Sequence, residues 1–322
     1  MNIFQHTLKN TVMARGIGLH TGKDVSITIS PAPENSGISF YHTGHGVVIP
    51  ANYRYISNTS LATTIGKSSA SVSTVEHLMA AFAGLGVDNA VVQIDGPEVP
   101  AMDGSAYPFV KLLNKAGLKA QSAPRNYLEI LDEVTVSQGD KYISIHPCSD
   151  TPSNDAGLTI SLTIDFDHAA VQRQSLSTRI SSKEFETKIC KARTFGFLHE
   201  IEALQKNGLA RGGSLENAVV IGQNGVLNRD GLRFSDEFVR HKILDMLGDL
   251  YLIGMPIIGR VNACKSGHAL HKMLVEKLMR NLNAWRVRNL ETITASIFQD
   301  GHLSPRLWPA SRGSRVAGRV VF

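Results

Sequence analysis

The segment Glu237–Gly254, EFVRHKILDMLGDLYLIG, is the stretch around which the rest of the chain is organised. Its apolar residues recur at steps of three and four, which predicts an amphipathic helix. His241 and Asp245 lie four residues apart, about 40° round the helix axis. An imidazole and a carboxylate one turn apart can bind a divalent metal ion, although a solvated polar face more often explains this spacing. A third ligand from elsewhere in the chain is needed to decide between the two.

The composition is that of a globular protein with a sizeable core. Of the 322 residues, 43% are hydrophobic and 19% are charged, enough for two ordinary domains or one large one. The net charge of +5 favours anionic partners such as nucleotides, phosphates or an acidic membrane surface. We expect neither a signal peptide nor a membrane-spanning helix. The cysteines are far apart in the sequence, which argues against a disulfide framework or a thiolate zinc site and suits a reducing cytoplasm.

A second segment, residues 71–96, also joins a helix to a strand. It reads SVSTVEHLMAAFAGLGVDNAVVQIDG, and its Ser73 and Glu76 match the S-x-x-E pattern of a capping box. In that case the Glu76 carboxylate caps the backbone of the helix. The alternative is that Glu76 and His77 both project from the first helical turn into a cleft. The residues alone leave both explanations open.

The two helical segments resemble each other. Aligning His77 with His241 places Gly84 on Gly248, and in each segment a strand follows. The repeat is weak. It would imply a duplicated α/β unit whose equivalent helices supply metal ligands at the interface between the units, a common location for a site.

The rest of the sequence is rich in predicted strands. His20, within the loop GIGLHTG, is interpreted as a hydrogen-bonded loop histidine, and QSAPRN at residues 121–126 is the best candidate for a linker. Residues 180–208 have helical character, and His268 stands at a helix N-terminus. The expected strands are residues 25–30, 89–94, 127–136, 142–146, 158–166, 218–221 and 259–264.

Several segments together resemble one family. STVEHLMAAFAGLGVDN, EVPAMDGSA, KARTFGF, DGLRFSDEFVRHKILDMLGDL and KSGHAL are similar to the signature segments of UDP-3-O-acyl-N-acetylglucosamine deacetylases, zinc enzymes of the committed step of lipid A biosynthesis. The likeness runs from about residue 3 to residue 290. It implies an α+β fold in which two similar α/β domains, residues 1–124 and 125–290, pack face to face around the active site. Residues 291–322 would form a basic tail.

The same resemblance implies a zinc site. Its ligands are His77, His241 and Asp245, which supplies the missing third ligand. Three nitrogen and oxygen ligands leave a fourth position for water, the arrangement of a catalytic zinc centre.

Catalytic roles also follow from the resemblance. Glu76 corresponds to the general base and His268 to the general acid, with Asp249 as the carboxylate partner of that histidine. Thr194 corresponds to a hydroxyl that helps to hold the oxyanion. Amide hydrolysis needs each of these functions, because water must be activated and the leaving amine must receive a proton. His271 is an alternative acid, but we interpret it as an ordinary histidine on the helix surface.

The resemblance assigns substrate contacts as well. One group corresponds to positions near the nucleotide and phosphate part of the substrate, and the other to positions along the acyl passage or its mouth. A phenylalanine can occur in relatives at the position of Leu215, so the width of the passage is open. The first group is Lys242 and Lys141, and the second is Phe195, Phe197, Leu19, Leu215 and Val220.

The resulting hypothesis is a cytoplasmic zinc hydrolase that removes the N-acetyl group from UDP-3-O-(3-hydroxyacyl)-N-acetylglucosamine. We expect a monomer that binds no nucleic acid, and a transient contact with a membrane surface stays open. One rival is a basic nucleotide- or nucleic-acid-binding protein in which the histidines are incidental. It predicts no bound metal and leaves the matching segments unexplained. The other rival is a zinc amidase acting on a different N-acyl sugar, from which only substrate contacts separate our hypothesis.

Overall fold

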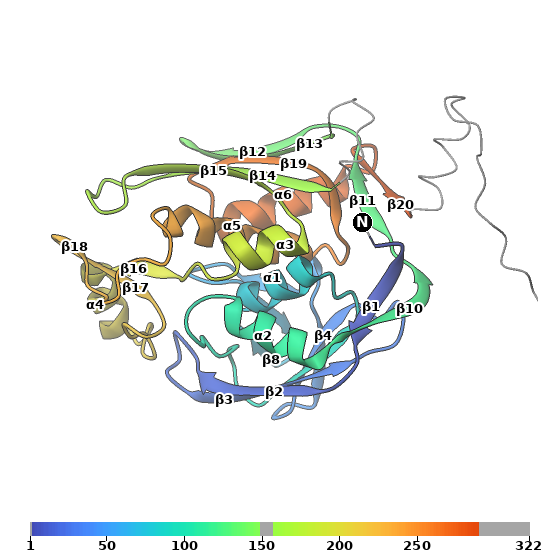
Figure 1. Cartoon of the computed structure of the whole chain (residues 1–322), viewed down its shortest axis with the longest axis horizontal. Helices are drawn as coiled ribbons and strands as arrows, with labels where there is room; N and C mark the ends of the chain where they lie inside the picture. The colour runs from blue at the N-terminus through green and yellow to red at the C-terminus, as the bar shows by residue number, and fades with distance from the viewer. Residues whose placement is uncertain (1, 149–156, 290–322) are drawn as a thin grey trace, which may run out of the picture.

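The computed structural model describes residues 2–148 and 157–289. Two sheets form the outer layers and helices form the layers between them (Figure 1). Helix α1 (Glu76–Leu85) packs on the first sheet and helix α5 (Glu237–Tyr251) on the second, and the two helices pack against each other. The expected α+β fold with two α/β units face to face is confirmed.

The first sheet has the strand order β2-β3-β9-β4-β5, with β4 and β9 the parallel pair. Alternation places Val25, Ile27 and Ile29 of β3 in the core. Helix α2 (Tyr107–Ala116) lies beside α1. A small sheet of β6 (Ile56–Asn58), β7 (Thr64–Lys67) and β8 (Ala70–Val72) is inserted between β5 and α1. The main strands are β2 (Val12–Ile17), β3 (Asp24–Pro31), β4 (Ile38–His42), β5 (Val47–Pro50) and β9 (Ala90–Ile94).

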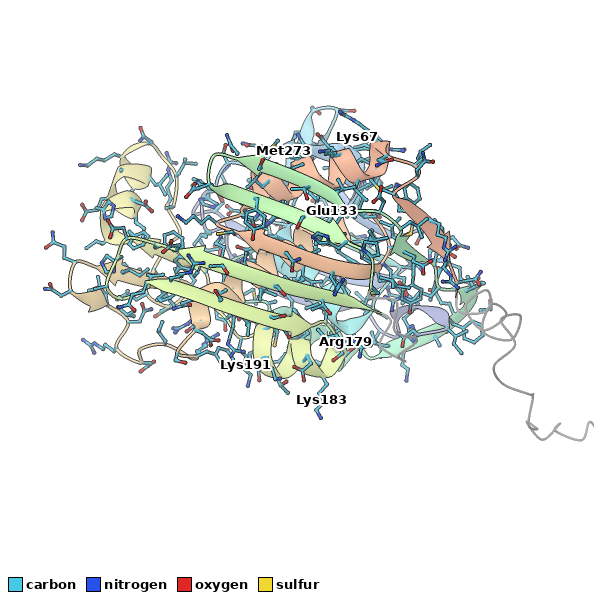
Figure 2. All side chains as sticks on the ribbon, turned by 90° about the horizontal axis from the view of Figure 1, so that it is seen from above. Lys67, Glu133, Arg179, Lys183, Lys191 and Met273 are labelled. Atoms are coloured by element: carbon cyan, nitrogen blue, oxygen red, sulfur yellow. The ribbon has the colours of Figure 1, made fainter. Side chains whose placement is uncertain are left out.

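The second sheet repeats this plan. β12, β13, β19, β14 and β15 follow one another across it, with β14 parallel to β19, and Figure 2 shows these strands nearest the viewer with helices behind them. Two further strands extend this sheet beyond the shared plan: β11 pairs parallel with the start of β19, and β20 pairs antiparallel with β11. Helix α6 (His268–Arg280) packs beside α5. The strands are β12 (Val134–Gln138), β13 (Lys141–His146), β14 (Leu158–Asp165), β15 (Arg173–Arg179) and β19 (Ile257–Cys264).

The second half has its own insertion, between β15 and α5. Its β16, α4, β17 and β18 part projects from the body of the molecule at the left of Figure 1. The whole insertion consists of α3 (Ser182–Glu184), the π-helical turn η2 (Phe185–Ile189), β16 (Phe195–Phe197), α4 (Leu198–Lys206), β17 (Val219–Gly222) and β18 (Gly225–Val226). The remaining elements are β1 (Phe4–Leu8), η1 (Tyr53–Tyr55), β10 (Leu118–Pro124), β11 (Tyr127–Ile130) and β20 (Trp285–Arg288).

The match between the halves covers the five main strands and two helices of each. In both, four strands are followed by an insertion, a helix, the central strand and a second helix. The aligned glycines allow close packing, because a Cβ on Gly248 would lie 2.0 Å from the carbonyl oxygen of Glu76 and one on Gly84 would lie 2.1 Å from the ring of Phe185. The weak repeat in the sequence therefore reflects two units of the same topology.

Some local expectations are wrong. Residues 121–124 belong to β10 and Arg125 is buried, so QSAPRN is not an exposed linker. Residues 127–136 form two strands separated at 131–133. The helical character expected for residues 180–208 is interrupted by β16, which pairs with β17. We propose the division after residue 124, where β10 ends, and this boundary stays a prediction. The predicted tail, residues 291–322, lies outside the described residues.

Candidate active site

The helices of the two halves bring their functional side chains to one cavity. Glu76 and His77 stand in the first turn of α1, His241 stands in the second turn of α5, and His268 begins α6. These residues line a cavity of about 270 Å³ whose wall also includes residues of the β16–β17 insertion. Each sequence-predicted metal ligand and both predicted proton-transfer residues therefore meet in one place.

The three predicted metal ligands have the spacing of a coordination site. Asp245 Oδ1 lies 3.4 Å from His77 Nε2 and 3.2 Å from His241 Nε2. Ligand atoms about 2.0–2.1 Å from a tetrahedral ion lie about 3.3 Å apart, so these distances fit one ion between them. Asp245 Oδ1 is also a buried oxygen without a hydrogen-bond partner among the described residues, as expected of an oxygen that coordinates a metal ion. The donor set fits a divalent metal.

The ring of His241 is oriented for ligation. Its Nδ1–H donates a hydrogen bond to the carbonyl oxygen of Ala192 at 3.0 Å, which leaves the lone pair on Nε2. Burial lowers the pKa of His241 to about 4, so the ring is neutral at physiological pH. Neutral imidazole is the form that binds metals.

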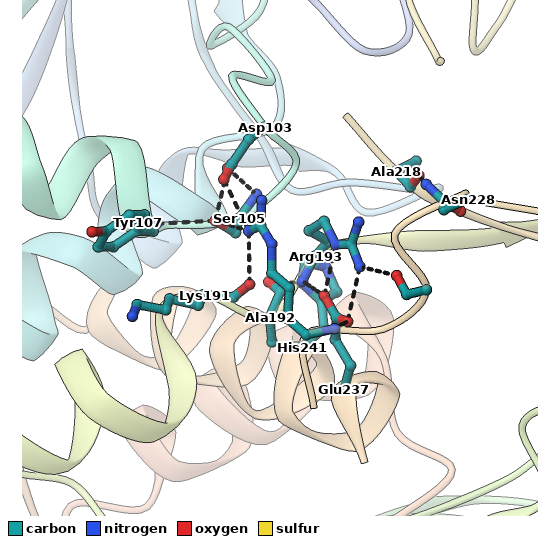
Figure 3. A network of polar contacts seen from close by, with 12 residues as sticks. Asp103, Ser105, Tyr107, Lys191, Ala192, Arg193, Ala218, Asn228, Glu237 and His241 are labelled. Carbon is teal, nitrogen blue, oxygen red and sulfur yellow. Dashed lines mark hydrogen bonds and ion pairs between the residues drawn. The ribbon is translucent and has the colours of Figure 1, made fainter. Parts of the chain in front are cut away.

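A buried ion pair holds the segment that carries Ala192. Glu237 on α5 is fully buried and accepts hydrogen bonds from the backbone and guanidinium of Arg193 (Figure 3). Arg233, which also donates to Glu237 through its backbone, forms an ion pair with Asp103. The segments KARTFGF, EVPAMDGSA and DGLRFSDEF, far apart in sequence, are thereby fastened to one another beside His241.

Lys242 contacts the predicted ligand Asp245 directly. Its Nζ donates to Asp245 Oδ2 at 2.8 Å and lies 5.7 Å from the centre of the Phe195 ring. Burial raises the pKa of Asp245, but His241 and Lys242 together hold it well below its usual value. The carboxylate therefore stays charged, with one oxygen on Lys242 and the other facing the two histidines.

A second cluster, Asp249 with His268 and His271, has different geometry. Asp249 Oδ2 lies 2.7 Å from Nδ1 of each histidine. This is shorter than the separation of two metal ligands and normal for a charge-assisted hydrogen bond. These residues therefore form a hydrogen-bonded group, and the metal-like spacing belongs to the first cluster.

The two proton-transfer candidates have displaced pKa values. Burial raises the pKa of Glu76 to about 7. Burial lowers the pKa of His268, but the Asp249 carboxylate raises it more, to about 9. His268 Nε2 faces Glu76 Oε1 at 3.8 Å. Near neutral pH the site thus contains a carboxylate able to accept a proton and an imidazolium able to donate one.

The predicted capping box is wrong. Val75 is the N-cap residue of α1, and it makes no side-chain cap. The hydroxyl of Ser73 accepts a hydrogen bond from Thr64, while Glu76 Oε2 accepts one from the backbone N–H of Thr63 at 3.1 Å. The Glu76 carboxylate is turned into the cavity because its partner lies on another loop.

Two histidines differ from their predicted environments. His271 is 1% exposed and donates to Asp249, so it is not a surface histidine. It is buried because its face of α6 packs against α5. His20 lines the cavity, and its Nδ1 is buried without a hydrogen-bond partner among the described residues, contrary to the hydrogen-bonded loop histidine expected.

The predicted substrate contacts divide into two groups. Leu19, Phe195, Phe197, Lys242 and the predicted oxyanion residue Thr194 line the cavity. Lys141 begins strand β13 and is exposed, Leu215 is 49% exposed before β17, and Val220 is buried on β17. The latter three are not part of the cavity wall as described.

Two other residues at the site, Phe166 and Glu98, were not predicted from the sequence. Phe166 lies with its ring 5.7 Å from those of Phe195 and Phe197, extending the apolar wall. Glu98, fully buried within EVPAMDGSA, accepts backbone hydrogen bonds from the His20–Thr21 loop and one from the hydroxyl of Thr74. Glu98 could have been selected from the sequence, because it lies inside EVPAMDGSA, a segment that resembles the family.

None of the described helices is long and apolar enough to cross a membrane.

The family sequence model described as "UDP-3-O-acyl N-acetylglycosamine deacetylase" matches residues 5–280. A protein of Myxococcus xanthus is 49% identical over 285 residues, 88% of each chain. One of Pseudomonas entomophila is 48% identical over 289 residues, 88% of this chain and 93% of the relative. Both relatives carry the name UDP-3-O-acyl-N-acetylglucosamine deacetylase.

Proposed function

The chain belongs to the UDP-3-O-acyl-N-acetylglucosamine deacetylase family, and we propose that it hydrolyses the N-acetyl group of UDP-3-O-(3-hydroxyacyl)-N-acetylglucosamine. The products are acetate and the free amine, and the reaction is the committed step of lipid A biosynthesis. The observation that carries the proposal is the buried His77, His241 and Asp245 cluster with Glu76 and His268 beside it.

We propose zinc as the metal, held by His77, His241 and Asp245. Two imidazoles and one carboxylate are a typical catalytic zinc ligand set, and the spacing of their ligand atoms supports it. When bound, the metal supplies Lewis acidity, which polarises an amide carbonyl and lowers the pKa of a water molecule. The Lys242 ammonium, which donates to Asp245 Oδ2, helps to keep the Asp245 carboxylate ionised for this role.

Glu76 and His268 divide the proton transfers between them. Glu76 accepts a proton from the attacking water, because its carboxylate faces the cavity and its pKa of about 7 allows it to exist ionised. His268 donates the Nε2 proton to the leaving amine, and the Asp249 carboxylate on Nδ1 keeps the ring protonated. Thr194 donates its hydroxyl hydrogen to the developing oxyanion. The sum is one amide and one water converted to one amine and one acetic acid.

The remaining substrate assignments are proposals of the same kind. Phe195, Phe197 and Leu19 would contact the acyl chain, since they line the cavity. Lys242 would face a phosphate group while holding Asp245. Lys141, Leu215 and Val220 would contact substrate outside the cavity. We also propose a cytoplasmic monomer that binds no nucleic acid and touches a membrane surface only transiently.

The test is an assay of acetate release from UDP-3-O-(3-hydroxyacyl)-N-acetylglucosamine. The matched comparison is UDP-N-acetylglucosamine, which has the same amide and nucleotide but lacks the acyl chain. We expect turnover of the acylated substrate at a kcat/KM at least about 100-fold higher, because remote binding energy is used in the transition state. Equal turnover of both would favour an amidase for another N-acyl sugar, and turnover of neither would reject the proposed function.

A further inference from the structure

The Asp249 carboxylate has more partners than the proposed mechanism uses. Its Oδ1 accepts a hydrogen bond from the Thr63 hydroxyl at 2.6 Å, and its Oδ2 accepts from both His268 and His271 at 2.7 Å. Thr63 and His271 are each 1% exposed and Asp249 is 3% exposed. Both oxygens are therefore engaged by groups that are themselves fixed in the core.

His271 is a neutral donor to this carboxylate. Burial lowers its pKa, which leaves one ring nitrogen protonated. An ionised carboxylate only accepts hydrogen bonds, so the proton lies on Nδ1. Nε2 then accepts from the Ser266 hydroxyl at 3.2 Å. A chain of hydrogen bonds thus runs from Ser266 through His271 and Asp249 to His268.

Thr63 approaches the same carboxylate from the other half of the molecule. It lies between β6 and β7 of the first-half insertion, whereas Asp249 and His268 belong to α5 and α6. Its hydroxyl donates to Asp249, and its backbone N–H donates to Glu76. The same hydroxyl lies 3.2 Å from His268 Nδ1, so one buried residue contacts the proposed base, the proposed acid and the carboxylate partner of that acid.

We propose that Thr63 and His271 are positioning residues that fix the plane of the Asp249 carboxylate and, through it, the His268 ring. A carboxylate held at one oxygen can rotate about its last side-chain bond, and with both oxygens held it cannot. The fixed Oδ2 then keeps His268 Nδ1 engaged and aims the Nε2–H at the cavity. This inference rests on the proposed function of His268 as the proton donor.

The Thr63 variants separate the hydroxyl from the backbone contact. Thr63→Val has the same shape and the same N–H to Glu76 but no donor for Asp249. We expect kcat to fall about 10- to 100-fold, part of the contribution of a well-placed general acid, with KM and zinc content within about two-fold of wild type. Thr63→Ser keeps the hydroxyl and should recover most of the lost kcat.

The His271 variants test the same carboxylate from its other side. The side-chain nitrogen of asparagine can occupy the place of His Nδ1, so His271→Asn retains a donor to Asp249, whereas His271→Leu does not. We expect kcat of the Asn variant to exceed that of the Leu variant at least about 5-fold, with metal content equal in both. Melting temperatures of all variants show which of them are folded at the assay temperature.

A double-mutant cycle with His268→Ala decides whether Thr63→Val lowers kcat by disturbing His268. Thr63→Val should lower the residual kcat of that variant less than two-fold, because effects of residues that act as a unit are non-additive. Wild-type kcat in both Thr63→Val and His271→Leu would overturn the inference. So would a loss of kcat on adding Thr63→Val to His268→Ala that is as large as its loss in the wild-type protein. Because each value is relative to wild-type deacetylation, an inactive wild type would instead reject the proposed function.

Discussion

Glu76 shows how much a single side chain's assignment depends on its surroundings. Its sequence context allows a helix cap or a catalytic base, and the structure removes the first option because the carboxylate turns away from the helix backbone to meet the N–H of Thr63.

Glu76→Gln retains the shape and the acceptor for Thr63 but cannot take a proton. We expect full zinc content, an unchanged melting temperature and a loss of kcat of about 100-fold or more. Near-normal kcat/KM in this variant would reject the catalytic role.

The two displaced pKa values predict a bell-shaped pH profile. Glu76 must be ionised, so kcat/KM rises as pH increases through its pKa of about 7. His268 must be protonated, so kcat/KM falls as pH increases through its pKa of about 9. The positive charge of a bound metal moves both limbs to lower pH. Steady-state kinetics from pH 5 to 10 measure the limbs, and His268→Ala should flatten the basic limb; a basic limb unchanged in that variant would contradict the assignment.

Lys242 carries a charge that serves both a ligand and the proposed substrate. Lys242→Met should raise KM about 10-fold and change kcat less, because a cation opposite a phosphate contributes mostly uniform binding. Zinc affinity should also fall, because Asp245 Oδ2 loses its partner. Assays at saturating zinc separate these effects. A large fall in kcat at unchanged KM would place Lys242 among the catalytic residues.

At the scale of the element, α1 and α5 were predictable because each combines apolar periodicity with a histidine in its N-terminal half. Strands such as β3 and β14 followed from alternation. The contact between Thr63 and Asp249 could not be predicted, because it joins a short loop to a residue 186 positions away. The burial of His271 depends on which face of α6 packs against α5, and the apolar periodicity of α6 alone did not predict that face.

The contact between α1 and α5 makes its own prediction. Gly248 packs against the backbone carbonyl of Glu76 so closely that a Cβ would lie 2.0 Å from the oxygen. Gly248→Ala must therefore push the helices apart, at a cost in unfolding free energy of about 1–3 kcal/mol, and it should lower kcat because Glu76 moves. Gly44→Ala, at a turn where the nearest atoms to a Cβ lie 3.5 Å away, is the control. Chemical denaturation measures both, and equal stabilities would contradict the close packing.

At the scale of the molecule, the site exists because two units of the same topology meet through equivalent helices. α1 supplies His77 and Glu76, α5 supplies His241 and Asp245, and the insertions add some of the residues that line the cavity. The sequence indicated this duplication only weakly, since few side chains repeat while the strand order does. The family resemblance predicted the three ligands, and the structure added the hydrogen-bonded groups that orient those side chains.

We propose that the two halves of the molecule share one catalytic metal. The most direct measurement is the zinc content per chain of the purified protein and of His77→Ala and His241→Ala, by atomic emission, with His45→Ala as a control in an exposed turn outside the site. We expect one zinc per chain in wild type and in His45→Ala, and loss of bound zinc in both ligand variants, since each removes one of the three proposed protein ligands from a different half. Full zinc content in either ligand variant would contradict this proposal.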